Sequence, residues 1–144
     1  MKIRRIVFDE ATFGVTQPSL KMLRDTLVRK AHHRIALIEV PTNDACCAYL
    51  ILDKALNDAT FTGDGFRMDR AGEGGAGYRS AKALFDLFGL RPIPGYTVNM
   101  DEIYQGKTDI ITKRLLKVAR DAADQLVDRD YVTLLDTTPQ YLTA

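Results

Sequence analysis

The sequence predicts a single α/β domain in which helices cover both faces of a mainly parallel, five-stranded sheet. Short strand-type runs alternate with longer segments of helical periodicity, which is the pattern of parallel strands joined by crossover helices. The chain has 144 residues, a length that suits one ordinary domain. Its hydrophobic fraction of 46% supplies a core without metal or disulfide cross-links. We therefore expect one three-layer α/β/α domain over residues 1–136 and a C-terminal tail over residues 137–144.

The first half of the chain is expected to hold three strands and two helices. Apolar residues recur at helical spacing from Leu20 to Ala31, after a helix-start signal at Pro18. Residues Asp44–Asn57 are apolar almost all round, which predicts a second, deeply buried helix. The strands are expected at Ile3–Phe8, at the nearly continuous apolar run Arg34–Val40 and at Ala59–Thr62.

The second half is expected to hold two helices and two strands after a glycine-rich loop. Six of the ten glycines lie between Gly63 and Gly77, and glycine clusters of this kind favour loops. Helices are expected at Tyr78–Phe88 and Asp109–Val127, and strands at Tyr96–Val98 and Tyr131–Leu135. Five strands in this arrangement suggest the order 2-1-3-4-5 of flavodoxin-like sheets.

Acidic residues follow several of the predicted strands. Asp9 follows the first strand, Asp64 the third and Asp136 the fifth, while Asp44 opens the predicted second helix. Ligands bind beyond the carboxyl ends of strands in open parallel sheets, and the first and third strands are expected to be neighbours. These four carboxylates therefore predict a site for Mg²⁺ or Mn²⁺, with Asp9 and Asp64 sharing the ion. The alternative interpretation is that they are ordinary turn and cap residues.

The glycine-rich segment predicts a second kind of site. Gly72–Gly77 ends at the expected N-terminus of a helix, where backbone N–H groups and the helix dipole favour a phosphate. The segment matches neither the Walker loop nor the dinucleotide fingerprint, and a surface loop is the alternative. The candidate phosphate-binding residues are Gly74, Gly75, Gly77, Arg79, Ser80 and Lys82.

The run Thr62-Gly63-Asp64-Gly65-Phe66, after a segment rich in Ala and Leu, resembles the T/S-G-D-x-D-F segment of PIN and NYN-type nuclease domains. One position of that segment is missing between Asp64 and Phe66. The resemblance implies a PIN-like α/β domain that cleaves RNA with Mg²⁺ or Mn²⁺. It makes Asp9 the first metal ligand, Asp64 a later one and Asp44 a third.

Three functions follow from these patterns. The first is metal-dependent phosphodiester hydrolysis, with Asp9 and Asp64 as the catalytic residues and RNA as the expected partner. The second is a non-catalytic module that binds a nucleotide or another phosphate through Gly72–Gly77. The third is an oligomeric interaction protein, since the apolar second helix is compatible with a homodimer.

Composition gives expectations about the partners and the cellular location of the protein. The formal net charge of +1 gives no global bias towards nucleic acid or membranes, so such binding would need a local patch. The two cysteines, Cys46 and Cys47, are adjacent and predict reduced core thiols in a cytoplasmic protein. We expect no membrane association, because no apolar run is long enough to span a bilayer.

Overall fold

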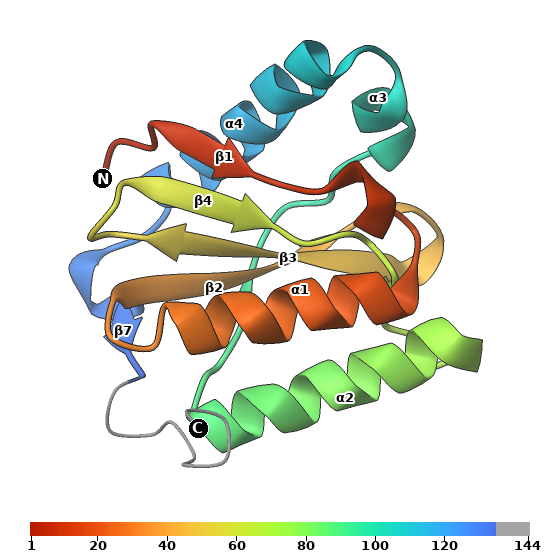
Figure 1. The fold of residues 1–144 in the computed structure, drawn as a ribbon, viewed down its shortest axis with the longest axis horizontal. Coiled ribbons are helices and arrows are strands. Elements are labelled where there is room, and N and C mark those ends of the chain that lie inside the picture. Colours follow the sequence, from red (N-terminus) through yellow and green to blue (C-terminus); the bar gives the residue numbers. More distant parts are fainter. Residues whose placement is uncertain (135–144) are drawn as a thin grey trace.

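The computed structural model describes residues 1–134, which form a mixed sheet with helices against both faces (Figure 1). The α-helices are α1 (Thr16–Arg29), α2 (Gly72–Phe88), α3 (Met100–Tyr104) and α4 (Thr108–Asp124). The strands are β1 (Arg5–Val7), β2 (Arg34–Pro41), β3 (Cys46–Asp53), β4 (Asp58–Phe61), β5 (Phe66–Arg67), β6 (Ile93–Pro94) and β7 (Val132–Thr133). Short 3-10 helices occupy Glu10–Thr12, Asn43–Ala45 and Asp128–Asp130.

The sheet has the order β1-β4-β3-β2-β6, with β5 paired to β3 and β7 paired to β2. Strands β2, β3 and β4 form an antiparallel meander, while β1 is parallel to β4 and β6 is parallel to β2. The α/β class is confirmed, but the prediction of a mainly parallel five-stranded sheet is wrong. The sheet is mixed because the chain returns through two hairpins where a crossover helix was expected.

The predicted helix Asp44–Asn57 is instead the central strand β3. Its residue Leu50 pairs with Ile38 of β2 on one side and Phe61 of β4 on the other. Residues 47–53 are buried, so both faces of the strand are apolar and the sequence shows no alternation. Tight turns enclose it, with φ of 55° at Asp44 and 53° at Asn57.

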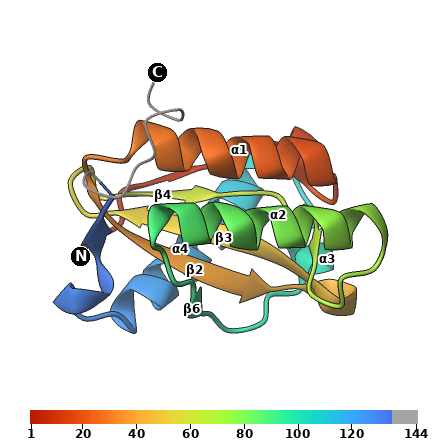
Figure 2. The same ribbon diagram turned by 90° about the horizontal axis from the view of Figure 1, so that it is seen from below.

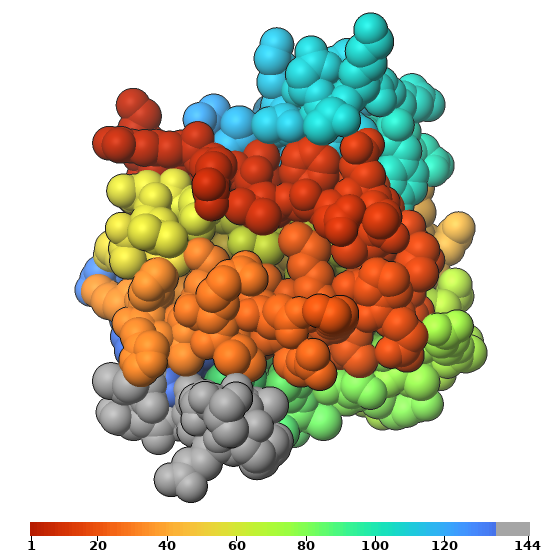
Figure 3. All heavy atoms as spheres, viewed as in Figure 1, coloured from red at the N-terminus to blue at the C-terminus, as the bar shows by residue number. Residues whose placement is uncertain are grey.

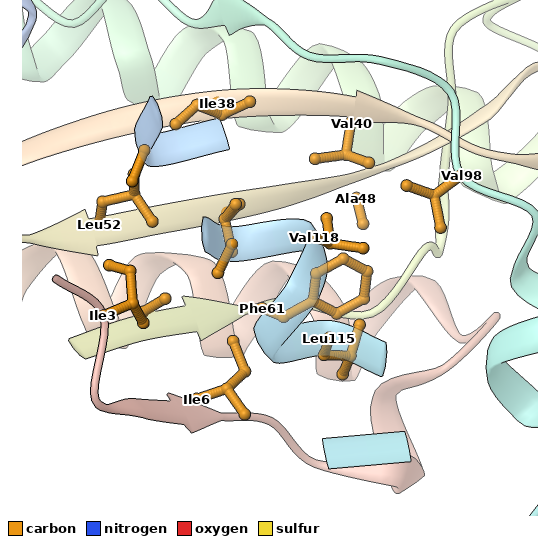
Figure 4. Packing of buried hydrophobic residues seen from close by; sticks show 14 of the residues in the cluster. Ile3, Ile6, Ile38, Val40, Ala48, Leu52, Phe61, Val98, Leu115 and Val118 are labelled. Atoms are coloured by element: carbon orange, nitrogen blue, oxygen red, sulfur yellow. The ribbon is translucent and has the colours of Figure 1, made fainter. Parts of the chain in front are cut away.

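Helices α1 and α2 lie side by side on one face of the sheet, and α4 covers the opposite face (Figure 2). On the α4 side, Leu115 and Val118 pack against Phe61 and Ile38 (Figure 4). On the other side, Leu23 of α1 and Phe85 of α2 belong to a second buried cluster with Leu37 and Tyr49. Burial of the two clusters from both sides fixes the register of the central strands.

The other predicted helices and strands agree with the structure in part. The strand at Ile3–Phe8 and the helices beginning near Pro18 and Asp109 are confirmed by β1, α1 and α4. The strand expected at Tyr96–Val98 is absent from the described chain, and the neighbouring Ile93–Pro94 forms β6 instead. Prolines in this stretch permit only a short edge strand. Strand β7 lies within the predicted Tyr131–Leu135, whereas Leu135, Asp136 and the predicted tail lie outside the described residues.

Candidate functional site

Three of the four predicted metal ligands follow strands that end at the same edge of the sheet. Strands β1, β4 and β2 run in one direction, so Asp9, Asp64 and Asp44 all lie beyond their carboxyl ends. The expected neighbourhood of the first and third predicted strands is confirmed, because Ile6 of β1 pairs with Ala59 of β4. The fourth ligand, Asp136, falls outside the described residues.

Each of these carboxylates has its own local role. One oxygen of the buried Asp64 accepts hydrogen bonds from Gly14 N at 2.7 Å and Tyr104 Oη at 2.6 Å. Burial, followed by the hydrogen bond to Asp64, raises the pKa of Tyr104, which keeps its hydroxyl a donor. Asp9 caps the 3-10 helix that follows β1, through Ala11 N at 3.0 Å. Asp44 is exposed in the β2–β3 turn.

These placements leave the predicted metal site incomplete. Among residues 1–134, no group of three or more His, Cys, Asp or Glu side chains could hold a metal ion. Asp64 already satisfies one oxygen with two neutral donors, as a structural carboxylate does. The described residues therefore do not fit the three-ligand set that the nuclease resemblance implies, and we derive no chemical step through a metal.

The predicted phosphate loop is helical. Gly72–Gly77 forms the first turns of α2, so the expected loop is wrong over these residues. A Cβ on Gly77 would lie 2.3 Å from Cγ2 of Thr16, and one on Gly75 would lie 2.0 Å from the backbone of Arg70. The helix tolerates glycine here because close packing against α1 and the preceding turn replaces the lost helix propensity.

The basic residues of the same segment have different surroundings. Lys82 turns to the sheet, where its Nζ lies 2.8 Å from Glu39 Oε1 and 4.9 Å from the centre of the Tyr78 ring. Arg79 donates to the backbone oxygen of Arg70 at 3.2 Å, and no carboxylate within residues 1–134 forms an ion pair with it. Ser80 is exposed on the outer surface of α2. Of the predicted set, Arg79 and Ser80 are thus accessible and Lys82 is committed to Glu39.

The outer surfaces of the two helices enclose a shallow groove of about 580 Å³, which we name the α1–α2 groove. Its floor contains Leu20 and Leu84, and its rim contains Gln17, Pro18, Lys21, Arg24 and Ser80. Both helices begin at the same end, as their colours show in Figure 2, and Thr16 contacts Gly77 there. Among the described residues, no side chain caps either N-terminus. The surface of α1 beside this groove is seen in Figure 3.

Charge along the groove is partly compensated. Lys21 Nζ lies 2.5 Å from Asp25 Oδ2 and Arg24 Nη2 lies 3.2 Å from Asp25 Oδ1, so two cations share one carboxylate. The hydrogen bond from Lys21, aided by Arg24, lowers the pKa of Asp25 despite slight desolvation. The basic face of the first helix is visible in the sequence, but its position beside Ser80 follows only from the packing of α1 on α2.

A second polar cluster, which sequence reasoning missed, lies at the opposite end of the sheet. The buried ammonium of Lys30 donates to Asp53 Oδ2 at 2.6 Å and to Asp58 Oδ1 at 3.1 Å. Nδ1 of His33 lies 2.6 Å from the same Asp53 oxygen. Burial raises the pKa of Asp53, but the hydrogen bonds from Lys30 and His33 outweigh it and lower the pKa overall. This cluster joins the end of α1 to the β3–β4 hairpin, and Arg5 Nη2 lies 3.6 Å from Asp58 as a further cation.

The two cysteines are free thiols, as expected, although they open β3 rather than a helix. Burial raises the pKa of Cys47 to about 12, so this thiol stays protonated at neutral pH. The helices of the described chain include none that is long and apolar enough to cross a membrane.

Comparisons of the chain with protein-family models, curated proteins and solved structures give no match. The resemblance to PIN and NYN-type nucleases therefore stays a prediction from the sequence. The function has to be argued from the surfaces of the molecule itself.

Proposed function

We propose that the protein is a non-catalytic module that binds the phosphate backbone of RNA in the α1–α2 groove. The observation that carries this proposal is an open groove between two helices whose rim holds Lys21 and Arg24 beside the exposed Ser80. This proposal keeps the phosphate-binding function that the glycine-rich segment suggested, and moves it from a loop to a helix surface.

Part of the positive charge at the groove comes from the start of a helix. The first N–H groups of a helix have no partner within it, and the aligned peptide dipoles add a partial positive charge at the same end. Gln17 of the first turn of α1 lines the groove, whereas residues 72–77 of α2 do not. Lys21 and Arg24 add a net positive charge after their shared ion pair with Asp25. Phosphate oxygens are the groups that such donors recognise.

The remaining residues of the groove favour RNA over a single small phosphate. The groove is open and extends along two helices, which suits a backbone with repeated phosphates. Gln17 and Ser80 offer an amide and a hydroxyl that can hydrogen-bond a ribose 2′-OH. Leu20 and Leu84 provide an apolar floor for the sugar carbons, and no aromatic side chain is present there to stack on bases. Recognition by shape and backbone rather than by sequence is therefore expected.

The test is fluorescence anisotropy with a labelled RNA duplex, the matching DNA duplex and single-stranded RNA. We expect RNA binding to weaken strongly with salt and to weaken by roughly tenfold in Lys21→Ala/Arg24→Ala, with a salt slope lower by about one per lost phosphate contact. Lys117→Ala is the matched control, because Lys117 also pairs with an acid four residues later, at 2.7 Å, but on α4. Binding that is absent, or that both variants reduce equally, would contradict the proposal.

Metal-dependent phosphodiester hydrolysis is the second candidate, favoured by one observation. Asp9 and Asp64 follow the adjacent, parallel strands β1 and β4. Mg²⁺ is commonly held by one or two carboxylates, with water and substrate phosphates completing its shell. Calorimetry with Mn²⁺ on the natural chain and on Asp64→Asn tests it. Saturable binding that Asp64→Asn abolishes would support this candidate and justify cleavage assays with RNA, whereas no binding to the natural chain would eliminate it.

A further inference from the structure

The outer edge of strand β1 is open. Strand β1 ends the sheet and pairs only with β4, and no second strand covers it within residues 1–134. Thr62 N donates to Tyr49 O, so the even-numbered residues of β4 bond to β3, and Ala59 and Phe61 direct their backbone groups towards β1. Since Ile6 lies opposite Ala59 in a parallel ladder, these groups bond to Arg5 and Val7. The N–H and C=O groups of Ile6 and Phe8 therefore point to the open side. Before the strand, the carbonyl oxygen of Ile3 accepts hydrogen bonds from Arg120 of α4.

The open edge lies in a groove rather than on a flat surface. The groove has a volume of about 540 Å³, and its walls are the residues from Arg5 to Glu10 and the first turns of α4 at Thr108 and Thr112. An extended strand can enter such a groove and continue the sheet through backbone hydrogen bonds. Exposed edges that natural proteins leave unprotected are templates for pairing with another chain.

The charges along β1 indicate which kind of chain can pair with its open edge. Lys2, Arg4 and Arg5 precede the apolar run Ile6–Phe8, and Asp9 and Glu10 follow it. The strand is thus basic at one end and acidic at the other. An interface between two identical copies related by a two-fold axis must be complementary to itself, and an antiparallel pair of such strands meets this condition.

We propose that two copies of this chain associate through antiparallel pairing of their β1 strands, centred on Val7. In this register Ile6 of each copy lies opposite Phe8 of the other, and the two residues exchange two backbone hydrogen bonds. Arg5 of each copy lies directly opposite Asp9 of the other, on the same face of the joined sheet. Pairs centred on Arg5 or Asp9 would instead place like charges opposite each other, which selects the Val7 register.

The side chains available at this edge agree with the register. Ile6 is buried and Phe8 is partly buried against the core on the α4 side, so alternation directs Arg5, Val7 and Asp9 to the other face. The side chain of Arg5 is 70% exposed and touches Asp58 only at 3.6 Å, which leaves it able to reach a second carboxylate. This surface is different from the apolar second helix from which a homodimer was first suggested, since that helix is strand β3.

The experiment is sedimentation equilibrium of the natural chain and of edge variants across a wide range of protein concentration. The natural chain should show a reversible monomer–dimer equilibrium. Phe8→Pro removes an outward N–H and leaves the bonds of Arg5 and Val7 to β4 intact, so it should raise the dissociation constant about tenfold or more. Arg29→Glu, an exposed charge reversal on α1, should leave the equilibrium unchanged.

Charge reversal tests the register independently. Arg5→Glu and Asp9→Lys should each dimerise more weakly alone, because each places like charges opposite one another. An equimolar mixture of the two should form a heterodimer, in which both cross-strand pairs are again of opposite charge. Recovery in the mixture also shows that both variants are folded. A natural chain that stays monomeric, a dimer that Phe8→Pro does not weaken, or a mixture without heterodimer would each overturn the proposal.

Discussion

The two ends of strand β4 place acidic residues in different electrostatic surroundings. At its start, Asp58 lies with Asp53 around the buried ammonium of Lys30. Beyond its end, Asp64 accepts hydrogen bonds from a backbone N–H and the Tyr104 hydroxyl, which are neutral donors. Burial of a carboxylate needs compensation, which a cation supplies at the first end and neutral hydrogen-bond donors supply at the second end. An acidic residue beside a strand thus acquires its role from the donors that the tertiary structure supplies.

The largest effect should come from removing the cation at the first end. Lys30→Met leaves Asp53 and Asp58 buried without their ammonium partner, and we expect a loss of about 3–5 kcal/mol in the free energy of unfolding. Urea unfolding measures it. Lys21→Met, on the exposed surface of the same helix, should cost less than about 1 kcal/mol. Equal losses in the two variants would show that the buried cluster contributes no more than a surface ion pair.

The next largest loss of stability should come from disturbing the close packing beyond the end of β4. A Cβ on Gly63 would lie 2.0 Å from the backbone oxygen of Thr12, so Gly63→Ala should destabilise by about 1–3 kcal/mol. A Cβ on Gly74 would lie 2.7 Å from Cγ of Arg67 rather than against backbone, so Gly74→Ala should cost less, because a side chain can shift and alanine favours the helix by up to about 1 kcal/mol. Thermal unfolding should therefore show a smaller loss for Gly74→Ala than for Gly63→Ala, and a loss at Gly74 as large as that at Gly63 would refute this account.

Removing a neutral donor at the second end should cost less. Tyr104→Phe deletes the hydrogen bond to Asp64 and should reduce the free energy of unfolding by about 1–2 kcal/mol. Tyr96→Phe is the control, because the Tyr96 hydroxyl donates to the more exposed Asp121 at 3.1 Å and its loss should cost less than about 0.5 kcal/mol. Urea midpoints at constant slope compare the two. Indistinguishable midpoints would mean that Tyr104 does not support Asp64.

The smallest expected effect is the dependence of stability on acid, which comes from Asp53 at the first end of β4. The pKa of Asp53 in the folded protein lies below its usual 3.8, because the bonds from Lys30 and His33 exceed the effect of burial. The stabilisation that this shift represents is complete above pH 3.8 and is lost as the pH falls through the folded value. Urea midpoints measured from neutral pH into acid should thus fall more steeply for the natural chain than for Lys30→Met. Parallel curves would exclude the Lys30–Asp53 interaction as a source of acid sensitivity.

The segment Cys46–Asp53 is a strand where the sequence predicts a helix, and the reason for this difference is physical. A strand buried on both faces is apolar throughout, and a buried helix has the same signature over so short a run. Ala45, Ala48 and Ala55 favour a helix, whereas the run Thr42-Asn43-Asp44 consists of turn-forming residues and is the signal for a hairpin. Once β3 is a strand, the hydrogen bonds of its neighbours make the sheet antiparallel at its centre.

The glycines of α2 and the cluster around Lys30 lay beyond sequence reasoning for a different reason. Gly75 and Gly77 have poor helix propensity, and only the proximity of Arg70 and Thr16 explains why glycine is needed in a helix. Lys30, Asp53 and Asp58 are far apart in sequence and are brought together by one helix and one hairpin. By contrast, Asp9 and Asp64 could be placed at neighbouring strand ends, because that depended on only the parallel pairing of β1 with β4.

The position of β1 has a consequence for the order in which the chain folds. Strands β2, β3 and β4 follow one another through short turns and can pair as soon as they are made, whereas β1 needs β4, which lies more than fifty residues later. Closing that long loop costs entropy before any bond rewards it, so we expect β1 to join last. During synthesis the first strand would wait, unpaired, until the third hairpin strand had emerged. Pulse-labelling hydrogen exchange should then protect the amides of Leu50 and Ile51 before that of Val7, and the reverse order would disprove this sequence of events.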